Sequence, residues 1–324
     1  MVTGGTGYIG AHTSRLLADR GDYVLVVDDL VTGSVDRIPG IPCVALNIAN
    51  GSADRLESLL REHRIDAVIH FAAQKQVAES VEKPAWYYEQ NVGSVAQLVM
   101  AMERADVYKL ILSSSAAVYG EASGSIAEAA PTRPINPYGA TKLVAEQIIT
   151  AATRAWPLRA ASLRYFNVGG AGAPELGDTQ ALNLIPICFE QISAGTSPVI
   201  FGDDYETPDG TCVRDYIHVS DVAEAHLAVL DALATEPGNA ILNIGTGVGT
   251  SVRTMVESIL AVSGSRLTAV VAKRRQGDPA AVVGEVDAIR ELTGWSARYT
   301  VADIVESAWT SRQYFQERER ERRS

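Results

Sequence analysis

Short apolar runs alternate with amphipathic stretches through the first half of the chain. The runs are too short for buried helices, and several, such as Leu25-Val26-Val27-Asp28, are apolar at consecutive positions rather than at every second one. This is typical of strands that are buried on both faces of a parallel sheet. The alternation predicts an α/β protein whose doubly wound parallel sheet carries helices on both faces. The predicted strands lie at Tyr23–Val27, Cys43–Leu46, Ala67–Phe71, Leu110–Ser113 and Arg159–Tyr165.

The pattern becomes irregular after Asn167, where small and turn-forming residues gather: Gly169, Gly170, Gly172, Pro174 and Gly177. Such a cluster favours a loop between two lobes. We therefore expect a first domain over residues 1–168, with short return segments from about 213–245, and a smaller C-terminal α/β domain over 169–324. Later strands are predicted at Pro198–Phe201, Ala240–Ile244 and Leu267–Val271, and helices around Leu184–Ser193, Val222–Ala234, Val252–Val262 and Val301–Phe315.

Composition limits the functions that this fold can serve. A chain of 324 residues with 47% hydrophobic content is long enough to bury a sizeable core and to form two lobes. Its formal charge of −11 argues against broad nucleic-acid binding, which needs a basic surface. No apolar run approaches the ~18–20 residues that span a bilayer, and no signal peptide precedes the first glycines. We therefore expect a cytoplasmic protein without a membrane segment.

Cysteine and histidine give no sign of a metal site. Cys43, Cys188 and Cys212 are far apart and lack the paired spacing of zinc ligands or of a disulfide framework, so we expect reduced thiols. His70 and His218 have no second ligand at metal spacing and fall within predicted strands. We expect both histidines to be structural.

The glycine-rich opening is the first candidate site. Gly4, Gly7 and Gly10 are evenly spaced and are followed by a predicted helix, a second strand and Asp28. Such glycines let the backbone turn tightly and approach a pyrophosphate at the start of the helix. A carboxylate at Asp28 can accept hydrogen bonds from ribose hydroxyls and would repel a 2′-phosphate. The pattern predicts a Rossmann-like site for NAD rather than NADP, with a short strand before Gly4.

Tyr138 and Lys142 form the second candidate site. They are one helical turn apart, so both side chains project from the same helix face. The lysine cation can stabilise the tyrosine phenolate and so make a proton acceptor that works near neutral pH. Ser115 follows a predicted strand at the carboxyl edge of the sheet, where its hydroxyl can lie beside the tyrosine. With the dinucleotide site, these residues predict hydride chemistry on an alcohol.

Five segments of the chain resemble the UDP-glucose 4-epimerase family, which belongs to the extended short-chain dehydrogenases/reductases. The resemblance covers essentially the whole chain, and its last segment is far more specific than the glycine loop. The segments are Gly4–Gly10, Ser113–Gly120, Tyr138–Lys142, Leu163–Asn167 and Phe201–Val219. The resemblance implies an NAD-dependent interconversion of UDP-glucose and UDP-galactose by transient oxidation at sugar carbon 4. It also implies a homodimer, here through helices near Asn91–Glu103 and Ala140–Ala152.

The resemblance assigns roles to the catalytic groups and to the cofactor pocket. Tyr138 would take the proton of the sugar 4-hydroxyl, Lys142 would bind the nicotinamide ribose and lower the pKa of Tyr138, and Ser115 would hydrogen-bond the same hydroxyl. Asn47 departs from the aspartate expected at its position, which implies weaker recognition of the adenine. The implied cofactor contacts are Gly4, Gly7, Tyr8, Ile9, Gly10, Asp28, Thr32, Gly33, Asn47, Ile48, Phe71, Ala72, Ala73, Lys75, Asn91, Ser113, Tyr138, Lys142 and Phe166.

The resemblance also implies a site for the nucleotide sugar. Arg214 and Arg275 would bind the diphosphate, because a planar guanidinium gives paired, charge-assisted hydrogen bonds to phosphate. Val282 would lie at the wall that faces the sugar, where a small residue admits an N-acetyl group and a tyrosine excludes it. The implied contacts are Ser115, Asn167, Asn183, Leu184, Phe201, Arg214, Tyr216, Arg275, Asp278 and Val282.

The residues after Ser115 distinguish between the reactions that proteins of the same fold catalyse. Dehydratases carry an acidic pair there and decarboxylases tend to carry a glutamate, whereas this chain has Ala116 and Ala117, which cannot move a proton. The alternatives are an epimerase dedicated to UDP-N-acetylglucosamine or a modified UDP-sugar, and a dehydratase or decarboxylase. A non-catalytic NAD-sensing protein is least favoured, because Tyr138 and Lys142 are both present.

Overall fold

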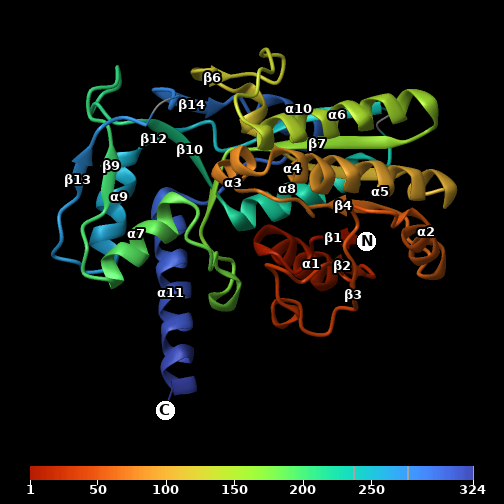
Figure 1. Ribbon diagram of the computed structural model, residues 1–324, viewed down its shortest axis with the longest axis horizontal. Coiled ribbons are helices and arrows are strands. Elements are labelled where there is room, and N and C mark those ends of the chain that lie inside the picture. The colour runs from red at the N-terminus through yellow and green to blue at the C-terminus, as the bar shows by residue number, and fades with distance from the viewer. Residues whose placement is uncertain (236–237, 276, 324) are drawn as a thin grey trace.

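The computed structural model describes residues 1–235, 238–275 and 277–323, and its largest sheet has seven parallel strands (Figure 1). Their order is β11-β7-β5-β4-β1-β2-β3. This is a doubly wound, Rossmann-like sheet, whose strand order reverses beside β1. The strands are β1 (Val2–Thr3), β2 (Val26–Asp28), β3 (Cys43–Ala45), β4 (Val68–His70), β5 (Lys109–Ser115), β7 (Arg159–Tyr165) and β11 (Gly238–Ile244).

Helices cover both faces of this sheet because its strands are apolar on both sides. Along β5, Leu110 and Leu112 face one way and pack in a cluster with Ile149, while Ile111 faces the other way and packs with Val229. The first face carries α2 (Ala53–Glu62), α5 (Gly93–Arg104) and α6 (Pro137–Ala155), and the second carries α1 (Tyr8–Arg20), α8 (Val219–Ala232) and α10 (Asp287–Thr293).

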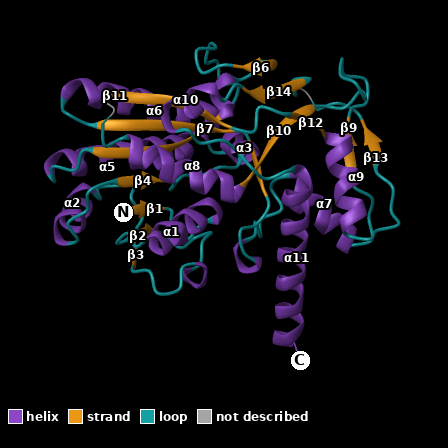
Figure 2. Ribbon diagram, turned by 180° about the vertical axis from the view of Figure 1, so that it is seen from behind, coloured by secondary structure: helices purple, strands orange, loops and turns teal. Residues whose placement is uncertain are grey.

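A smaller lobe lies beside the carboxyl edge of the large sheet (Figure 2). It has a five-stranded mixed sheet in the order β12-β10-β14-β6, with β8 beside β10, and a two-stranded sheet of β13 and β9. In Figure 1, α11 runs from this lobe beyond the other elements to the C-terminus. The elements are β6 (Gly124–Ile126), β8 (Asn167–Gly169), α7 (Leu184–Ser193), β9 (Val199–Phe201), β10 (Val213–His218), β12 (Gly249–Ser251), α9 (Val252–Val262), β13 (Val270–Ala272), β14 (Ala281–Gly284) and α11 (Val301–Arg323).

Short helical turns make the connections around the edge of the large sheet. They are the 3-10 turns η1 (Val35–Arg37), η3 (Ala116–Tyr119) and η4 (Pro174–Leu176), the π-helical turn η2 (Tyr88–Val92), and the short helices α3 (Val77–Glu82) and α4 (Pro84–Tyr87).

The structure changes some of the predicted element bounds. The strand expected at Leu267–Val271 is Val270–Ala272. The helix expected from Val222 begins at Val219, because the His218 side chain accepts a hydrogen bond from Ser220 N and caps it. Of the return segment 213–245, α8 and β11 pack on the large sheet, whereas β10 belongs to the five-stranded sheet. The domain boundary at 168 stays a prediction.

Candidate active site

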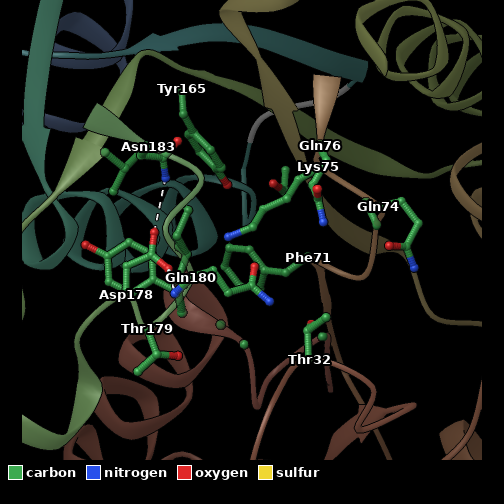
Figure 3. A pocket seen from close by; sticks show the side chains of 18 of the residues that line it. Thr32, Phe71, Gln74, Lys75, Gln76, Tyr165, Asp178, Thr179, Gln180 and Asn183 are labelled. Atoms are coloured by element: carbon green, nitrogen blue, oxygen red, sulfur yellow. Dashed lines mark hydrogen bonds between the residues drawn. The ribbon is translucent and has the colours of Figure 1, made fainter. Parts of the chain in front are cut away.

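A cavity of about 640 Å³ opens at the carboxyl edge of the large sheet and is lined by both lobes. Its walls come from the residues that follow β1, β2, β4, β5 and β7, together with α6, α7 and α11. Ligands of doubly wound folds bind at this edge. In Figure 3, Phe71 and Lys75 face the interior of the cavity from one side, and Asp178 and Asn183 lie on the opposite side.

The glycine loop is shaped to hold a dinucleotide against the start of α1. A Cβ atom on Gly4 would lie 2.6 Å from Ala72 N, and one on Gly10 would collide with the Gly4 carbonyl, so both glycines are needed for packing. A Cβ on Gly7 would approach Gly4 O to 3.3 Å, and Gly7 itself lines the cavity. Since Gly7 brings no side-chain cap to α1, the first amides of the helix are available for a phosphate.

Asp28 lies at the end of β2 on the wall of the same cavity. Its carboxylate accepts hydrogen bonds from Thr6 N at 3.0 Å and from Leu30 N at 2.9 Å, which fix its orientation. Gly33 does not line the cavity; a Cβ there would collide with Thr6 Oγ1, so this glycine allows the loop after β2 to pack on the glycine loop. The residues present therefore fit an adenosine ribose beside Asp28 and a diphosphate beside Gly7.

Helix α6 carries Tyr138 and Lys142 to the cavity in the way that their spacing predicts. Pro137 is the first residue of the helix, and the Asn136 side chain caps it by accepting a hydrogen bond from Gly139 N at 2.9 Å. A Cβ on Gly139 would lie 2.6 Å from Ala117 O, so the absence of a side chain lets α6 approach η3 closely. Tyr138, Lys142 and Ser115 all line the cavity.

Burial dominates the electrostatics of this group. Burial raises the pKa of Tyr138 above its ordinary value, and a hydrogen bond with Ser115 offsets this in part. Lys142 Nζ lies 6.0 Å from the centre of the Tyr138 ring and donates a hydrogen bond to Ser113 O at 2.8 Å. Burial lowers the pKa of Lys142 to about 8. The lowering of the pKa of Tyr138 by Lys142 stays a prediction.

Several residues of the predicted sugar site line the part of the cavity next to the second lobe. Asn183 Nδ2 donates a hydrogen bond to Asp178 Oδ2 at 3.1 Å (Figure 3), which places the asparagine beside the mouth of the cavity. Val282 packs in a cluster with Phe166. The other predicted residues that line this part are Asn167, Leu184 and Tyr216.

Four residues of the predicted nucleotide-sugar site, including the two arginines predicted to bind the diphosphate, lie together but not on the cavity wall. The Arg275 guanidinium lies 3.9 Å from the centre of the Phe201 ring, and Arg214 lies 3.8 Å from the Asp278 carboxylate. Arg214 also donates hydrogen bonds to Val213 O and Pro279 O. The register pairs Arg214 with Val282, which does line the cavity. The roles of these four residues stay predictions.

Asn91 also lies behind the wall rather than on it. Its buried side chain accepts a hydrogen bond from Gln74 N at 2.7 Å and donates to Gln74 O and Thr141 Oγ1, each at 3.0 Å. It therefore joins α6 to the loop after β4. The remaining predicted cofactor residues lie on the wall: Tyr8, Ile9, Thr32, Asn47, Ile48, Phe71, Ala72, Ala73, Lys75, Ser113 and Phe166.

The sequence analysis missed Tyr165 and His226. Tyr165 lines the cavity, and its hydroxyl lies 2.5 Å from His226 Nε2. His226 Nδ1 lies 2.7 Å from Val222 O, so Nδ1 carries the ring hydrogen and Nε2 accepts from the tyrosine. The motif Leu163–Asn167 contains the signal for Tyr165, whereas an isolated histidine inside a helix gives none.

Within the described ranges, no group of histidine, cysteine or acidic side chains has the geometry of a metal site. His70 Nδ1 lies 2.7 Å from Thr3 Oγ1, and His218 lies 3.0 Å from Ser307 Oγ, so both bond within the protein. The three cysteines are free. None of the helices described here is long and apolar enough to cross a membrane.

These features define a class of protein: a Rossmann-fold protein with a dinucleotide cavity and a tyrosine–lysine pair of the short-chain dehydrogenase type. The comparison with known proteins is more specific. Residues 1–245 match the NAD dependent epimerase/dehydratase family, and the chain belongs to that family. The cofactor is therefore NAD.

The relatives share both sequence and structure with the chain. It is 46% identical to the UDP-glucose 4-epimerase of Azospirillum brasilense, over 95% of this chain and 90% of that protein. It superposes with a TM-score of 0.92 on the UDP-glucose 4-epimerase of Stenotrophomonas maltophila, whose structure holds NAD and formylated UDP-arabinopyranose; the two are 38% identical and 98% of each chain is covered. The UDP-Glc/GlcNAc 4-epimerase of Campylobacter jejuni gives 0.86 at 36% identity, over 96% of this chain and 98% of that one.

Proposed function

We propose that this protein is a UDP-glucose 4-epimerase that interconverts UDP-glucose and UDP-galactose with NAD as its cofactor. The observation that carries the proposal is the meeting of Tyr138, Lys142 and Ser115 on one cavity wall that also includes the glycine loop. The two positions after Ser115 are Ala116 and Ala117, which line the cavity and carry no acidic group. The site therefore supports oxidation and re-reduction at one carbon rather than elimination of water. The enzyme is an isomerase.

The side chains divide the proton chemistry between them. Tyr138 Oη accepts the proton of the sugar 4-hydroxyl and later returns it, and Ser115 Oγ hydrogen-bonds the same oxygen. Lys142 opposes the cost of a buried phenolate by placing a cation beside it. The chemistry that NAD supplies when bound is the reversible acceptance of a hydride from carbon 4. Since the 4-keto sugar can present either face before the hydride returns, the configuration inverts and no net oxidation occurs.

The second lobe supplies the nucleotide-sugar contacts in this proposal. Arg214 and Arg275 carry the charges that suit a diphosphate. Arg214, on β10, is paired in the sheet register with Val282 of the cavity wall, and Arg275 lies over the Phe201 ring. Holding the diphosphate while leaving the sugar free to turn is what the inversion requires. Val282 is a small side chain that lines the cavity and packs in a cluster with Phe166. We propose that the enzyme also acts on UDP-N-acetylglucosamine and UDP-N-acetylgalactosamine.

We also propose that the protein is a cytoplasmic homodimer that pairs through α5 and the helix α6. Met100 lies in α5 and Tyr88 lies in η2 just before it. Both are exposed side chains with apolar surface, 38% and 41% accessible. Exposed apolar groups on adjacent helices favour association. Analytical ultracentrifugation should find a dimer for the native chain and a shift toward monomer for Met100→Glu. A native chain that sediments as a monomer at micromolar concentration would refute this part.

A hydroxyl deletion tests the proposed chemistry. Tyr138→Phe should lower kcat with UDP-galactose by about 10²–10⁴-fold, because the proton acceptor is gone while the fold and the NAD site remain. Tyr23→Phe removes an exposed hydroxyl far from the cavity and is the matched control. Activity of Tyr138→Phe equal to that of the control would remove Tyr138 from the reaction.

A further inference from the structure

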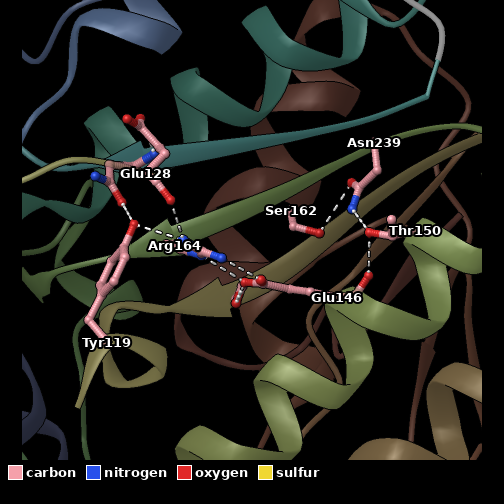
Figure 4. A network of polar contacts seen from close by, with 9 residues as sticks. Tyr119, Glu128, Glu146, Thr150, Ser162, Arg164 and Asn239 are labelled. Carbon is pink, nitrogen blue, oxygen red and sulfur yellow. Dashed lines mark hydrogen bonds and ion pairs between the residues drawn. The ribbon is translucent and has the colours of Figure 1, made fainter. Parts of the chain in front are cut away.

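A buried ion pair joins α6 to β7 (Figure 4). Glu146 of α6 and Arg164 of β7 are 3% and 4% exposed. Arg164 Nη2 donates to Glu146 Oε2 at 2.7 Å and Arg164 Nε to Glu146 Oε1 at 3.0 Å, so the pair is bidentate. The mechanism described above does not use either residue.

The ion pair is joined to both halves of the catalytic group. Glu146 is one helical turn beyond Lys142 on α6, and its Oε1 accepts a hydrogen bond from Ser114 Oγ at 2.5 Å. Lys142 itself donates to Ser113 O at 2.8 Å. Helix α6 is therefore held to the end of β5 at two successive turns. The sheet register pairs Ser114 with Arg164, so the guanidinium stands next to the same strand end.

A second set of polar contacts fixes the arginine. Arg164 Nη1 donates to Tyr119 Oη at 2.9 Å and to Glu128 O at 3.1 Å. Tyr119 Oη donates to Asn243 Oδ1 at 2.7 Å, and Asn243 N donates to Glu128 Oε1 at 2.9 Å. The network thus ties η3, β7 and β11 to the catalytic helix.

We propose that Glu146 and Arg164 are positioning residues for the reaction, which set the charge and the place of Lys142 beside Tyr138. Glu146 supplies the negative charge that keeps the buried lysine cationic. Arg164 holds that carboxylate in place, and its positive charge partly offsets the electrostatic effect of the carboxylate on Lys142. This inference rests on the roles proposed for Tyr138 and Lys142.

The surroundings of Lys142 explain why a carboxylate is needed there. Burial favours the neutral amine and lowers the pKa of Lys142 to about 8, while Glu146 raises it. The titratable and charged groups on the elements packed around it include His70 of β4, Tyr87 of α4, Tyr119 of η3, Tyr138 and Glu146 of α6, and Arg164 and Tyr165 of β7. Two further elements that pack on α6 carry Glu79 and Glu82 (α3) and Tyr88 and Glu89 (η2). The histidine is neutral because burial lowers its pKa to about 3. Burial and Glu146 therefore act on the pKa of Lys142 in opposite directions.

A stable core does not require this pair, because an apolar pair of similar size often stabilises a fold as well. What an apolar pair cannot do is hold a charge at a fixed distance from Lys142. The two ions act on that lysine with opposite signs. Removing them one at a time therefore separates an electrostatic role from a structural one.

The test is the pH dependence of kcat/KM for UDP-galactose in Glu146→Gln and Arg164→Gln. Glu146→Gln removes the negative charge, so the alkaline limb should move to lower pH by about one unit. Arg164→Gln leaves the carboxylate unopposed, so that limb should move to higher pH. Tyr119→Phe is the neutral control; it breaks two hydrogen bonds of the network and should leave the limb in place.

Opposite shifts of the two charge variants support the proposal. The proposal is overturned if the alkaline limbs of Glu146→Gln and Arg164→Gln coincide with that of Tyr119→Phe. It is also overturned if both limbs move in the same direction. If Arg164→Gln does not fold, Glu146→Gln against Tyr119→Phe still decides, because only the charge change should move the limb. Lys142→Met tests the underlying roles separately. If Lys142→Met keeps native activity, the roles proposed for Tyr138 and Lys142 are refuted. If Lys142→Met loses activity but the alkaline limbs of Glu146→Gln and Arg164→Gln do not shift, only the present inference is refuted.

Discussion

We predict that a single side chain, that of Val282, limits the substrate range of this protein. It lies on β14, lines the cavity and packs in a cluster with Phe166. Gly284 on the same strand cannot take a larger residue without a shift, because a Cβ there would lie 2.6 Å from the Phe166 ring. Val282 and Phe166 therefore limit the space on this part of the cavity wall.

Val282→Tyr should close the space for an N-acetyl group. A pocket that cannot hold an extra group rejects it by about 1–3 kcal/mol, so kcat/KM for UDP-N-acetylgalactosamine should fall by about 10–200-fold. The value for UDP-galactose should change by less than about threefold. Val248→Tyr, at an exposed position, is the control. Equal losses with both substrates would show that Val282 does not discriminate between them.

Some site residues could be predicted from the sequence and others could not. Tyr138, Lys142 and Gly4–Gly10 are local patterns, and a helix or a turn brings them together without long-range information. His226 is isolated in the sequence, and its contact with Tyr165 depends on how α8 packs against the sheet. Glu146 has the helical spacing that places it next to Lys142, but its partner Arg164 lies on another strand.

At the scale of elements, the approach of α6 to β5 and η3 decides the geometry of catalysis. Gly139 permits this approach at the first turn of the helix, where a Cβ would lie 2.6 Å from Ala117 O and 3.1 Å from the carbonyl carbon. The Lys142–Ser113 and Glu146–Ser114 hydrogen bonds hold the next two turns. Tyr138 and Ser115 are thus placed by three contacts between α6 and the edge of the sheet.

Gly139→Ala should therefore impair chemistry more than cofactor binding. The added methyl group pushes the first turn of α6 away from η3 and moves Tyr138 relative to Ser115. A displacement of about 1 Å can cost about 10²-fold in rate. We expect a lower kcat together with near-native retention of NAD, measured by the cofactor released on denaturation. Gln147→Ala, on the exposed face of the same helix, is the control. Native kcat in Gly139→Ala would contradict this account of the helix.

The strands of the large sheet were predicted from the sequence, whereas β6, β8, β12 and β14 of the smaller lobe were not. Arg159–Tyr165 has the bounds that its apolar run indicates, because the strand is buried along nearly its whole length. β6, β8 and β12 are three residues each, too short to show a period, and β14 is only slightly longer. β8, β12 and β14 pair with β10, and β6 pairs with β14, so these strands form only in the assembled lobe.

At the scale of the whole molecule, buried histidines join elements that are far apart in the sequence. His12 of α1 accepts a hydrogen bond from Gly172 N at Nε2, and His218 contacts Ser307 of α11. Burial lowers the pKa of four of the five histidines, to about 4 for His12, His218 and His226 and to about 3 for His70. A protonated ring at these places would lose its acceptor nitrogen as well as its solvation.

These histidines predict a loss of stability in mild acid. Each is neutral in the folded chain but binds a proton in the unfolded chain below its ordinary pKa of 6.5, so the unfolded state takes up more protons as the pH falls. The stabilisation is complete above pH 6.5 and is lost progressively toward pH 4. At pH 5.5, each histidine should cost about 1.4 kcal/mol. Melting temperatures measured at pH 7.5, 6.5 and 5.5 should fall steeply over the last step.

The variant His70→Asn tests whether the histidines cause this fall of the melting temperature in mild acid. His70→Asn keeps a polar group beside Thr3 and cannot titrate in this range. It should be less stable than the native chain at pH 7.5 and lose less further stability between pH 6.5 and 5.5. A native melting temperature that does not change from pH 7.5 to 5.5 would contradict the burial of four neutral histidines.

The central claim is that the cavity inverts carbon 4 of a UDP-hexose. The most direct measurement is proton NMR of UDP-galactose incubated with the purified protein, with and without supplied NAD. The account predicts that signals of UDP-glucose grow to a constant ratio while the mass of the nucleotide sugar stays the same. A product lighter by one water, or an unchanged UDP-galactose spectrum even with NAD present, would contradict it.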